Sequence, residues 1–371
     1  GVSPATISLV LNNKPGISDA LRKSLLEKIQ ELGHEEMLCE SYRNGAGPVE
    51  KSPPPNESPQ SGCACKVIAY LIFGEKEYLV DMNDPYNFFA GVLEGVEAEA
   101  WENDCCVVIL HMNKRKNVRL AEQLRRAGTV LGAIVHHAPL NENIRRELKD
   151  CGVPCVFLDA YNPTGWEPSS VCISNRQGMK NAIGYLRDMG HRNIGYVYSG
   201  WEHHVQKDRR QCFSQVMSDF GLQLRKENFF CSGTGDELLE YQRLAKVLAA
   251  ADDLPTALMC ENDRQAWRTI KALREIGKQV PKDVSVMGFD DQVICTQIEP
   301  NITSIHNSAQ LMGRKCVIML KNLARLRELG EEDPWLRYEL PARLVVRGSV
   351  ADLNAAKPAQ GHKEGAEDAD G

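Results

Sequence analysis

Hydrophobic residues follow two different periods along most of the chain. Short apolar runs rich in Val, Ile and Leu predict strands at residues 66–74, 105–112, 130–137, 155–160, 193–200, 256–262 and 283–290. Between these runs, apolar residues recur every three or four positions, which predicts helices at 88–103, 176–189, 206–220 and 263–276. Apolar strands that alternate with amphipathic helices are typical of parallel sheets covered on both faces. We therefore expect an α/β fold made of two doubly wound parallel-sheet subdomains.

The first 34 residues carry the pattern of two short helices instead. Ser3 and Pro4 suit the start of one helix, and Ser18 and Gly33 suit the start and the end of a second. Apolar residues recur at helical spacing in both: Ile7, Val10 and Leu11, then Leu21, Leu25, Ile29 and Leu32. A first helix this short needs a partner to cover its apolar stripe. We therefore expect a partial all-α headpiece at 1–34 that lacks a helix before Gly1.

Two segments show no sustained apolar period. Residues 35–65 are rich in Pro, Gly, Ser and Glu, which predicts a flexible linker. Residues 352–371 are polar and acidic, which predicts a disordered tail. The region between them, 66–351, is expected to form the main domain.

Length and charge limit the classes of function. At 371 residues with 43% hydrophobic residues, the chain exceeds what one core usually holds. The net charge is −6, whereas residues 1–34 hold four basic and three acidic side chains, so any contact with DNA is expected to be local to the headpiece. There is no run of about 18 apolar residues and no secretion signal. We expect a cytoplasmic protein that makes no contact with membranes.

The 13 cysteines are scattered along the chain, which favours a reducing compartment. The motifs Cys63-Ala-Cys65 and Cys105-Cys106 raise the possibility of a metal or redox site, but no spacing matches paired CxxC knuckles. We interpret these cysteines as free thiols and expect neither a metal nor another cofactor. Because the chain lacks G-x-S-x-G, H-E-x-x-H and Walker motifs, we do not expect an enzyme.

Polar residues follow several of the predicted strands. In open α/β sheets, ligands bind beyond the carboxyl ends of the strands. The polar residues at these ends are Asp159, Asn262, Asp263, Asp290 and Asp291, and the loop after 193–200 adds Trp201, His203, His204, Arg209 and Arg210. Several such side chains at one edge favour a cleft for a polar ligand.

Five segments together resemble the lactose-repressor (LacI/GalR) family of bacterial transcription regulators. They are VSPATISLVLN (2–12), MGHRNIGYV (189–197), CENDRQA (260–266), VPKDVSVMGFDD (280–291) and ARLVVRGSVA (342–351). The resemblance implies a helix-turn-helix headpiece, which binds double-stranded operator DNA, joined to a periplasmic-binding-protein-like domain for a small effector. It places the DNA contacts on the first helix, at Ser3, Pro4, Ala5, Thr6, Ser8, Leu9 and Asn12.

The same resemblance implies an effector site. Matching motifs place effector contacts at Phe88, Phe89, Arg209, Asn262 and Asp290, to which the strand-end analysis adds Asp159 and Trp201. Aromatic faces stack on sugars, while guanidinium and carboxylate groups bind hydroxyls, so the expected effector is a sugar. The chain departs from the family pattern in its linker, which lacks the Arg-x-Leu hinge helix, and at Arg268, where glycine is usual.

We therefore expect a homodimeric repressor whose operator affinity is controlled by an effector bound between two subdomains. The first subdomain is expected at about 66–160 plus 293–324, and the second at about 161–292 plus 325–351. The chain should cross between them near residues 160, 292 and 325. The alternatives are a cytosolic sugar sensor without competent DNA binding and a solute-binding-type protein.

Overall fold

The computed structural model of this protein describes residues 10–11, 18–31, 65–73, 88–112, 124, 129–136, 142–160, 168–200, 203–234, 237–331 and 334–355. The chain divides into two compact units, residues 1–63 and 64–371, and each is described by itself. None of the helices within the described ranges combines the length and the apolar character needed to cross a membrane.

The first unit contains the predicted second helix, α2 (Asp19–Glu31). Ser18 caps this helix as expected, because its Oγ accepts a hydrogen bond from the Leu21 amide at 3.4 Å. Val10 is fully buried, in agreement with its predicted apolar stripe. Leu21, which was expected on the buried face of α2, is 36% exposed. The seven predicted DNA contacts, residues 3–6, 8, 9 and 12, lie outside the described residues.

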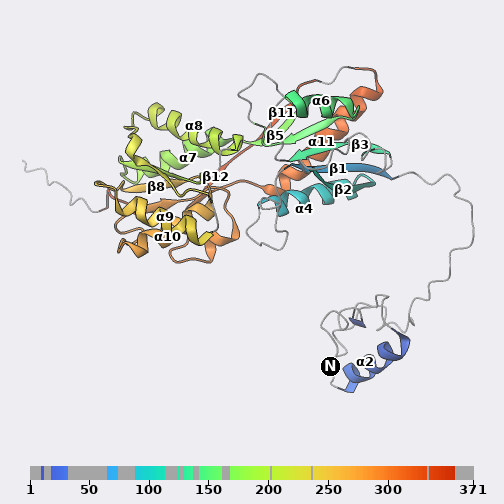
Figure 1. The fold of residues 1–371 in the computed structure, drawn as a ribbon, viewed down its shortest axis with the longest axis horizontal. Helices are drawn as coiled ribbons and strands as arrows, with labels where there is room; N and C mark the ends of the chain where they lie inside the picture. The colour runs from blue at the N-terminus through green and yellow to red at the C-terminus, as the bar shows by residue number, and fades with distance from the viewer. Residues whose placement is uncertain are drawn as a thin grey trace, which may run out of the picture. The chain divides into compact units, whose positions relative to one another are not determined.

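The second unit contains two lobes, each built on its own parallel sheet (Figure 1). The N-terminal lobe has a six-stranded sheet of order β11-β5-β4-β3-β1-β2. Its strands are β1 (Lys66–Phe73), β2 (Cys105–Met112), β3 (Val130–His136), β4 (Cys155–Leu158), β5 (Ser170–Ile173) and β11 (Arg337–Leu340). All neighbours in this sheet pair in parallel, as the apolar runs predict.

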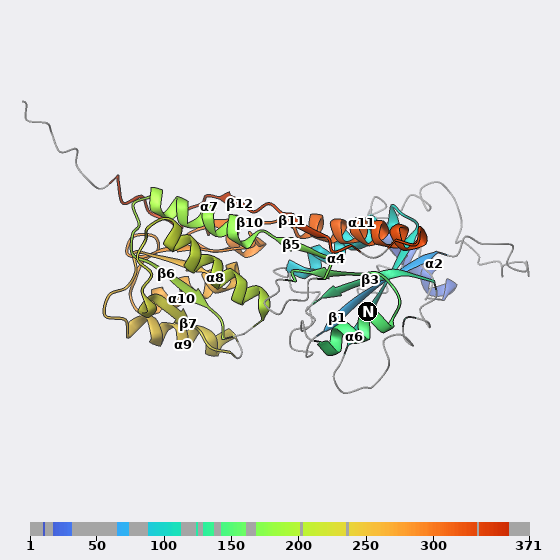
Figure 2. The same cartoon turned by 90° about the horizontal axis from the view of Figure 1, so that it is seen from above.

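Helices cover both faces of the N-terminal sheet. The helices are α4 (Phe88–Trp101), α6 (Glu142–Asp150) and α11 (Ala309–Glu328). Alternate residues of β1 point to opposite faces, so Ile68 packs in one apolar cluster with Val92 of α4 and Leu320 of α11. Leu71 packs in a second cluster with Leu148 of α6. Figure 2 shows α11 and α6 on opposite sides of this sheet.

The C-terminal lobe has a four-stranded parallel sheet of order β7-β6-β8-β9. Its strands are β6 (Ile194–Tyr198), β7 (Phe229–Cys231), β8 (Ala257–Cys260) and β9 (Ser285–Met287). Four helices cover it: α7 (Asn175–Asp188), α8 (His204–Asp219), α9 (Glu237–Ala249) and α10 (Asp263–Glu275). Figure 1 shows α7 and α8 on one face and α9 and α10 on the other. The strands β10 (Ser304–His306) and β12 (Arg343–Val345) form an antiparallel pair beside β9.

The chain crosses between the lobes at positions that differ from those predicted. The crossings lie at Ser174, between β5 and α7, at 307–308, between β10 and α11, and at 341–342, between β11 and β12. The expected positions near 160, 292 and 325 are corrected because β5 and β11 extend the N-terminal sheet beyond β4. In addition, the whole of α11 packs on that lobe, against α4 and β3.

The start of the predicted disordered tail is held by the C-terminal lobe. The Leu353 amide donates to the Met189 carbonyl at 2.9 Å, and the Asn354 side chain donates to the Asp188 carbonyl at 2.8 Å. The prediction that a disordered tail begins at residue 352 is therefore corrected, because residues 353 and 354 are still bonded to the lobe. Its residues 356–371, and linker residues 35–64, lie outside the described residues.

Candidate effector site

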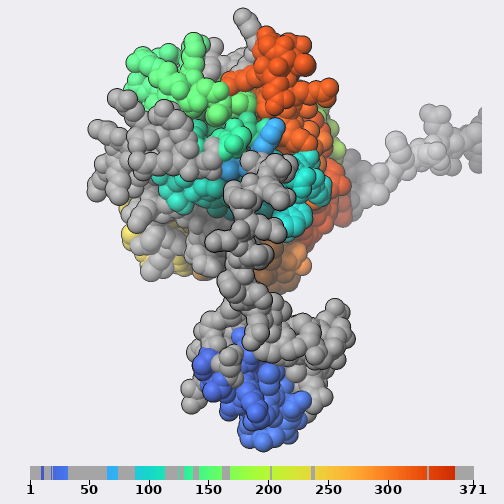
Figure 3. Space-filling view, turned by 90° about the vertical axis from the view of Figure 1, so that its right-hand side faces the viewer, coloured from blue at the N-terminus to red at the C-terminus, as the bar shows by residue number. Residues whose placement is uncertain are grey.

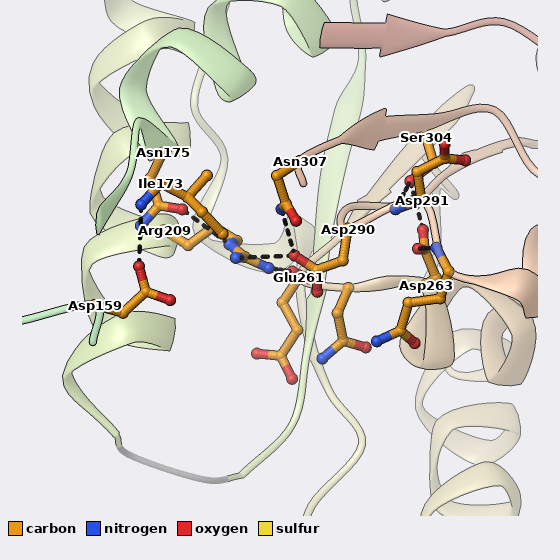
Figure 4. A network of polar contacts seen from close by, with 12 residues as sticks. Asp159, Ile173, Asn175, Arg209, Glu261, Asp263, Asp290, Asp291, Ser304 and Asn307 are labelled. Carbon is orange, nitrogen blue, oxygen red and sulfur yellow. Dashed lines mark hydrogen bonds and ion pairs between the residues drawn. The ribbon is translucent and has the colours of Figure 1, made fainter. Parts of the chain in front are cut away.

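Arg209 is the centre of a polar network in the C-terminal lobe (Figure 4). It lies in the second turn of α8, and Phe213, one turn later, is fully buried in the core. The Arg209 guanidinium donates to three groups: Asn175 Oδ1 at 3.2 Å, the Glu261 carbonyl at 2.5 Å and Asp290 Oδ1 at 3.3 Å. It also lies 3.9 Å from the centre of the Phe289 ring. Its direction is thus fixed by three different elements and an aromatic face.

Asp290 is the anionic partner of Arg209. The side chains of the pair are only 8% and 12% exposed. Asp290 follows β9 in a turn with φ of +101°, a value that side chains rarely adopt and that is often associated with function. Its amide donates to the Ile305 carbonyl at 2.8 Å, so β10 holds this turn in place.

Asn307 completes the network from the crossing between β10 and α11. Its Nδ2 donates to Asp290 Oδ1 at 3.0 Å. Because an ionised carboxylate oxygen can only accept, the atom of Asn307 that faces Asp290 is the amide nitrogen, and Oδ1 points away from Asp290. Asn307 is 4% exposed, and its Oδ1 has no hydrogen-bond partner within the described ranges. A buried acceptor of this kind is available to a hydroxyl or N–H donor.

A second group of carboxylates lies behind the Asp290 turn. Asp263 is fully buried, and it accepts from Ser304 Oγ at 2.5 Å and from the Gln292 amide at 2.7 Å. Burial, reinforced by the nearby charge of Asp290, raises the pKa of Asp263 to about 8. Asp291 pairs with Arg347 at 2.7 Å and with His306 at 3.0 Å. These contacts fix the turn that presents Asp290.

The N-terminal lobe has an aromatic group at the start of α4. Phe88 and Phe89 begin α4, and the Phe89 ring centre lies 4.0 Å from that of His136 at the end of β3. His136 Nδ1 lies 3.2 Å from the hydroxyl of Tyr70. Burial lowers the pKa of His136 to about 3, with a smaller effect of the same sign from His203. His136 is therefore a neutral side chain at neutral pH.

The two lobes are joined by direct hydrogen bonds beside the crossings. His204, the first residue of α8, donates through Nε2 to the carbonyl of Asp159 at 2.7 Å. Ser174 Oγ lies 3.2 Å from Glu339 Oε2, which connects the start of α7 to β11. Burial lowers the pKa of His204. The first bond connects the start of α8 to the residue that follows β4, and the second connects the start of α7 to β11.

The structure brings some of the sequence-predicted residues together and gives others structural contacts. Arg209 and Asp290 pair directly, and Phe88 and Phe89 lie next to each other with ring centres 5.5 Å apart. Asn262 Oδ1 caps α10 by accepting from the Gln265 amide at 2.9 Å, which occupies one of the two lone pairs of this oxygen. Trp201 lies outside the described residues.

Asp159 illustrates a further structural role. Its carboxylate accepts from the Ile173 amide at 3.0 Å, with φ at +49°. Sequence reasoning missed Asn175, His136 and Asn307. Asn307 follows β10, whose three residues, Ser304–His306, are too few to show an apolar pattern, and Asn175 acts through a contact with Arg209 that no spacing reveals.

Arg268, which departs from the family pattern, has its own buried partner. Its Nη1 lies 2.7 Å from Glu240 Oε2, and it donates to Gln265 Oε1 at 3.1 Å. Gln265 in turn donates to Ser232 Oγ at 2.6 Å, next to the end of β7. The larger side chain is accommodated by an acidic residue of α9. In the part of the chain that the structure describes, no group of His, Cys, Asp and Glu is arranged to hold a metal ion.

Comparison with known proteins gives consistent results. Residues 183–350 match the description "Periplasmic binding protein-like domain". The HTH-type transcriptional repressor PurR of Vibrio vulnificus is 25% identical over 365 residues, which cover 95% of this chain and 97% of that repressor. The HTH-type transcriptional regulator reg1 of Streptomyces lividans is 28% identical over 366 residues, which cover 95% of this chain and 94% of that regulator.

A solved structure extends this similarity to the fold. The LacI family transcriptional regulator from Enterococcus faecium with bound ribose is 25% identical, with a TM-score of 0.60 over 78% of this chain and 100% of that one. The two lobes and the match to residues 183–350 give the chain a fold similar to that of periplasmic-binding-protein-like domains. The chain is thus similar to LacI/GalR-like regulators, and its relatives named here are transcriptional regulators.

Proposed function

We propose that this protein is a transcriptional repressor whose affinity for a DNA operator is set by a small polar effector bound between the lobes. The observation that best supports an effector site is the buried group formed by Arg209, Asp290 and Asn307. A buried charge pair of this kind contributes little net stability compared with apolar packing. Its position beyond the end of β9, where α/β sheets bind ligands, supports a role in recognition.

We propose that the effector is a sugar. Asp290 accepts hydrogen bonds, Arg209 donates them, and the Asn307 oxygen accepts one more, which suits a ligand with several hydroxyl groups. Phe88 and Phe89 supply an aromatic face of the kind that stacks on the C–H edges of a sugar ring. The bound ribose of the Enterococcus faecium regulator supports the same class of ligand.

The proposed mechanism couples the effector to the hinge. Asn307 contacts Asp290 and also lies at a crossing between the lobes, so a ligand bonded to either residue would act directly on the hinge. An effector that contacts both lobes makes more contacts when the lobes are close together, so its binding favours that closed conformation. In a homodimer, the closure of each lobe pair would change the spacing of the two headpieces, which couples effector and operator binding.

Calorimetric titration tests the effector site. The probes are D-ribose and a panel of other aldoses and disaccharides, added to the full chain. For a sugar that binds, Arg209→Ala should weaken the affinity about ten- to a hundredfold, because charge-assisted hydrogen bonds of about 1.5–3 kcal/mol are lost. Arg210→Ala, on the same helix, is the matched control and should change the affinity little. Equal affinity for Arg209→Ala and the parent protein would contradict the assignment of the site.

Selection of bound fragments from sheared genomic DNA tests the repressor function. A chain extended before residue 1 by a first headpiece helix of the family should enrich a recurrent site with two-fold symmetry, because a dimer presents two identical headpieces. The binding sugar should change the enrichment. Sugar binding with no enriched site would instead favour the alternative, a sugar sensor without competent DNA binding. The alternative rests on the linker, which lacks the family's hinge pattern.

A further inference from the structure

Two cysteine side chains lie in contact where the chain enters the N-terminal lobe. Cys65 directly precedes β1, and Cys106 is the second residue of β2, the edge strand of the sheet. Their sulfur atoms are 3.1 Å apart, and both side chains are exposed. The Cys65 thiol also lies 3.2 Å from the carbonyl oxygen of Asp104. Figure 3 looks onto this end of the lobe, where atoms of β1 reach the surface beside those of residues 88–112.

The strand register explains why these two residues meet. Lys66 lies opposite Cys105, and Val67 lies opposite Cys106. Aligned residues of parallel strands point to the same face and successive residues alternate, so Cys65 and Cys106 share the face of Val67. Cys105 points to the opposite face, where it is buried in the core with Ile68 and Val96. The pair is thus fixed by the sheet itself, and the adjacent cysteine is excluded from it.

We propose that Cys65 and Cys106 are a reversible disulfide-forming pair, a modification site at the junction between the headpiece unit and the lobes. The linker-containing unit ends at residue 63, and the second unit begins at 64, immediately before Cys65. The other described cysteines whose side chains are buried, such as Cys260 and Cys316, are shielded from oxidants. The pair combines exposure with a second thiol in contact, which are two features of redox-sensitive cysteines, while the hydrogen bond with Cys106 raises the pKa of the Cys65 thiol.

The oxidant is a peroxide, and the reaction occurs in two steps. One thiolate attacks an oxygen atom of hydrogen peroxide, so that an S–O bond forms, the O–O bond breaks and hydroxide leaves to become water on protonation. The second thiol then attacks the sulfenic sulfur, so that the S–S bond forms, the S–O bond breaks and a second water leaves. The two cysteines lose two electrons and the peroxide gains them. A small dithiol reverses the reaction by thiol–disulfide exchange.

The bond would tie the start of β1 to the edge strand. Without it, the contacts of the Cys65 thiol with the backbone are its hydrogen bonds to the carbonyl oxygens of Lys66 and Asp104. With it, the residue at which the chain leaves the lobe is attached covalently to β2. The proposed consequence is a restriction of the segment that leads to the headpiece. It depends on neither an effector nor an operator.

Peptide mapping of the full chain tests the proposal. The protein is treated with hydrogen peroxide, the remaining thiols are alkylated, and the protein is digested without reductant. A linked peptide pair containing residues 65 and 106 is expected, and dithiothreitol should abolish it. Because Cys63 and Cys105 lie in the same two tryptic peptides, the double variant Cys63→Ser/Cys105→Ser is included and should retain the link.

Matched variants decide the outcome. Cys65→Ser and Cys106→Ser should each abolish the link, while Cys151→Ser, which removes a partly exposed cysteine elsewhere, should leave it unchanged. Amide exchange at the start of β2 should slow on oxidation in the parent protein and remain the same in Cys106→Ser. A link that persists in Cys65→Ser, a link between two copies of the chain, or no link at full consumption of the exposed thiols would overturn the proposal.

Discussion

Arg209, in the proposed effector site, forms a charge pair with Asp290 that water barely reaches. Arg209 has hydrogen bonds to a side chain, a backbone carbonyl and a carboxylate, and a ring covers its face. An arginine at this helix position could also have been a solvated surface charge, for which replacement would hardly affect the fold. Its burial changes that expectation, because removing one partner of a buried pair leaves the other charge uncompensated.

Arg209→Ala is therefore expected to lower the free energy of unfolding as well as effector affinity. The loss should be about 3 kcal/mol, since Asp290 would keep only part of its hydrogen bonding. Arg210→Ala loses a contact between its guanidinium and the Tyr198 ring, 4.7 Å away, and should cost less than about 1 kcal/mol. Urea denaturation of the two variants measures both values. Equal losses would show that burial of Arg209 has no energetic consequence.

Asp263 should make the stability depend on pH. Its pKa of about 8 in the folded protein lies above its ordinary value of 3.8, so the folded state retains a proton that the unfolded chain releases between these values. The free energy of unfolding contributed by Asp263 therefore falls as pH rises from about 4 to 8.

Asp263→Asn should remove this part of the pH dependence. Between pH 5 and pH 8 the parent protein should lose a few kcal/mol more than the variant, since each pKa unit corresponds to about 1.4 kcal/mol. Denaturation midpoints at the two pH values provide the measurement. Asp252→Asn, at an exposed position, serves as control and should follow the parent. A parent and Asp263→Asn with parallel pH profiles would contradict the shifted pKa.

At the scale of the elements, α4 and α11 pack closely against each other in the described core of the N-terminal lobe. Gly95 and Gly313 make it possible, because a Cβ on Gly95 would overlap the carbonyl oxygen of Gln310, and one on Gly313 would overlap that of Val92. These overlaps involve backbone atoms, which cannot rotate away as a side chain can. The two helices can therefore pack at this distance only because glycine occupies both positions.

Gly313→Ala should destabilise the protein by about 1–3 kcal/mol through overpacking, despite the better helix propensity of alanine. Gly184→Ala in α7 is the matched control. An added Cβ there would lie 3.7 Å from the Phe220 ring, an ordinary contact, so it should be neutral or stabilise by about 0.5–1 kcal/mol. Thermal and urea denaturation distinguish the two. A stabilising Gly313→Ala would mean that the helices can separate at no cost.

At the scale of the whole molecule, the chain divides into two compact units, residues 1–63 and 64–371. The apolar clusters described for the two lobes consist of residues from Ile68 onward, all of which belong to the second unit. The described cores of the lobes therefore consist of residues of the second unit.

Deletion of residues 1–63 should leave the main thermal transition of the lobes and the affinity for any bound sugar unchanged, while abolishing DNA binding. Calorimetry of the parent and the shortened chain tests this expectation. A clear fall in the transition temperature would show that the first unit stabilises the lobes.

The sequence by itself determined the elements that are long and strongly periodic. The strands β1, β2 and β3 begin where the apolar runs begin, and α4, α7, α8 and α10 lie within one or two residues of their predicted bounds. Arg209 and Asp290 were also identified from motifs, and they lie in contact. Local hydrophobic pattern and capping suffice here, because each element carries its own period and its own end signals.

Only the tertiary structure decided which lobe each segment joins. β5, β11 and β12 have three or four residues, too few to show a period, and their places depend on the strands they pair with. The crossings moved for that reason, and Asn307 became a site residue because β10 brings it to Asp290. The contact between Cys65 and Cys106 likewise requires the register of two strands about 40 residues apart, which hydrogen bonding between strands sets and local sequence does not.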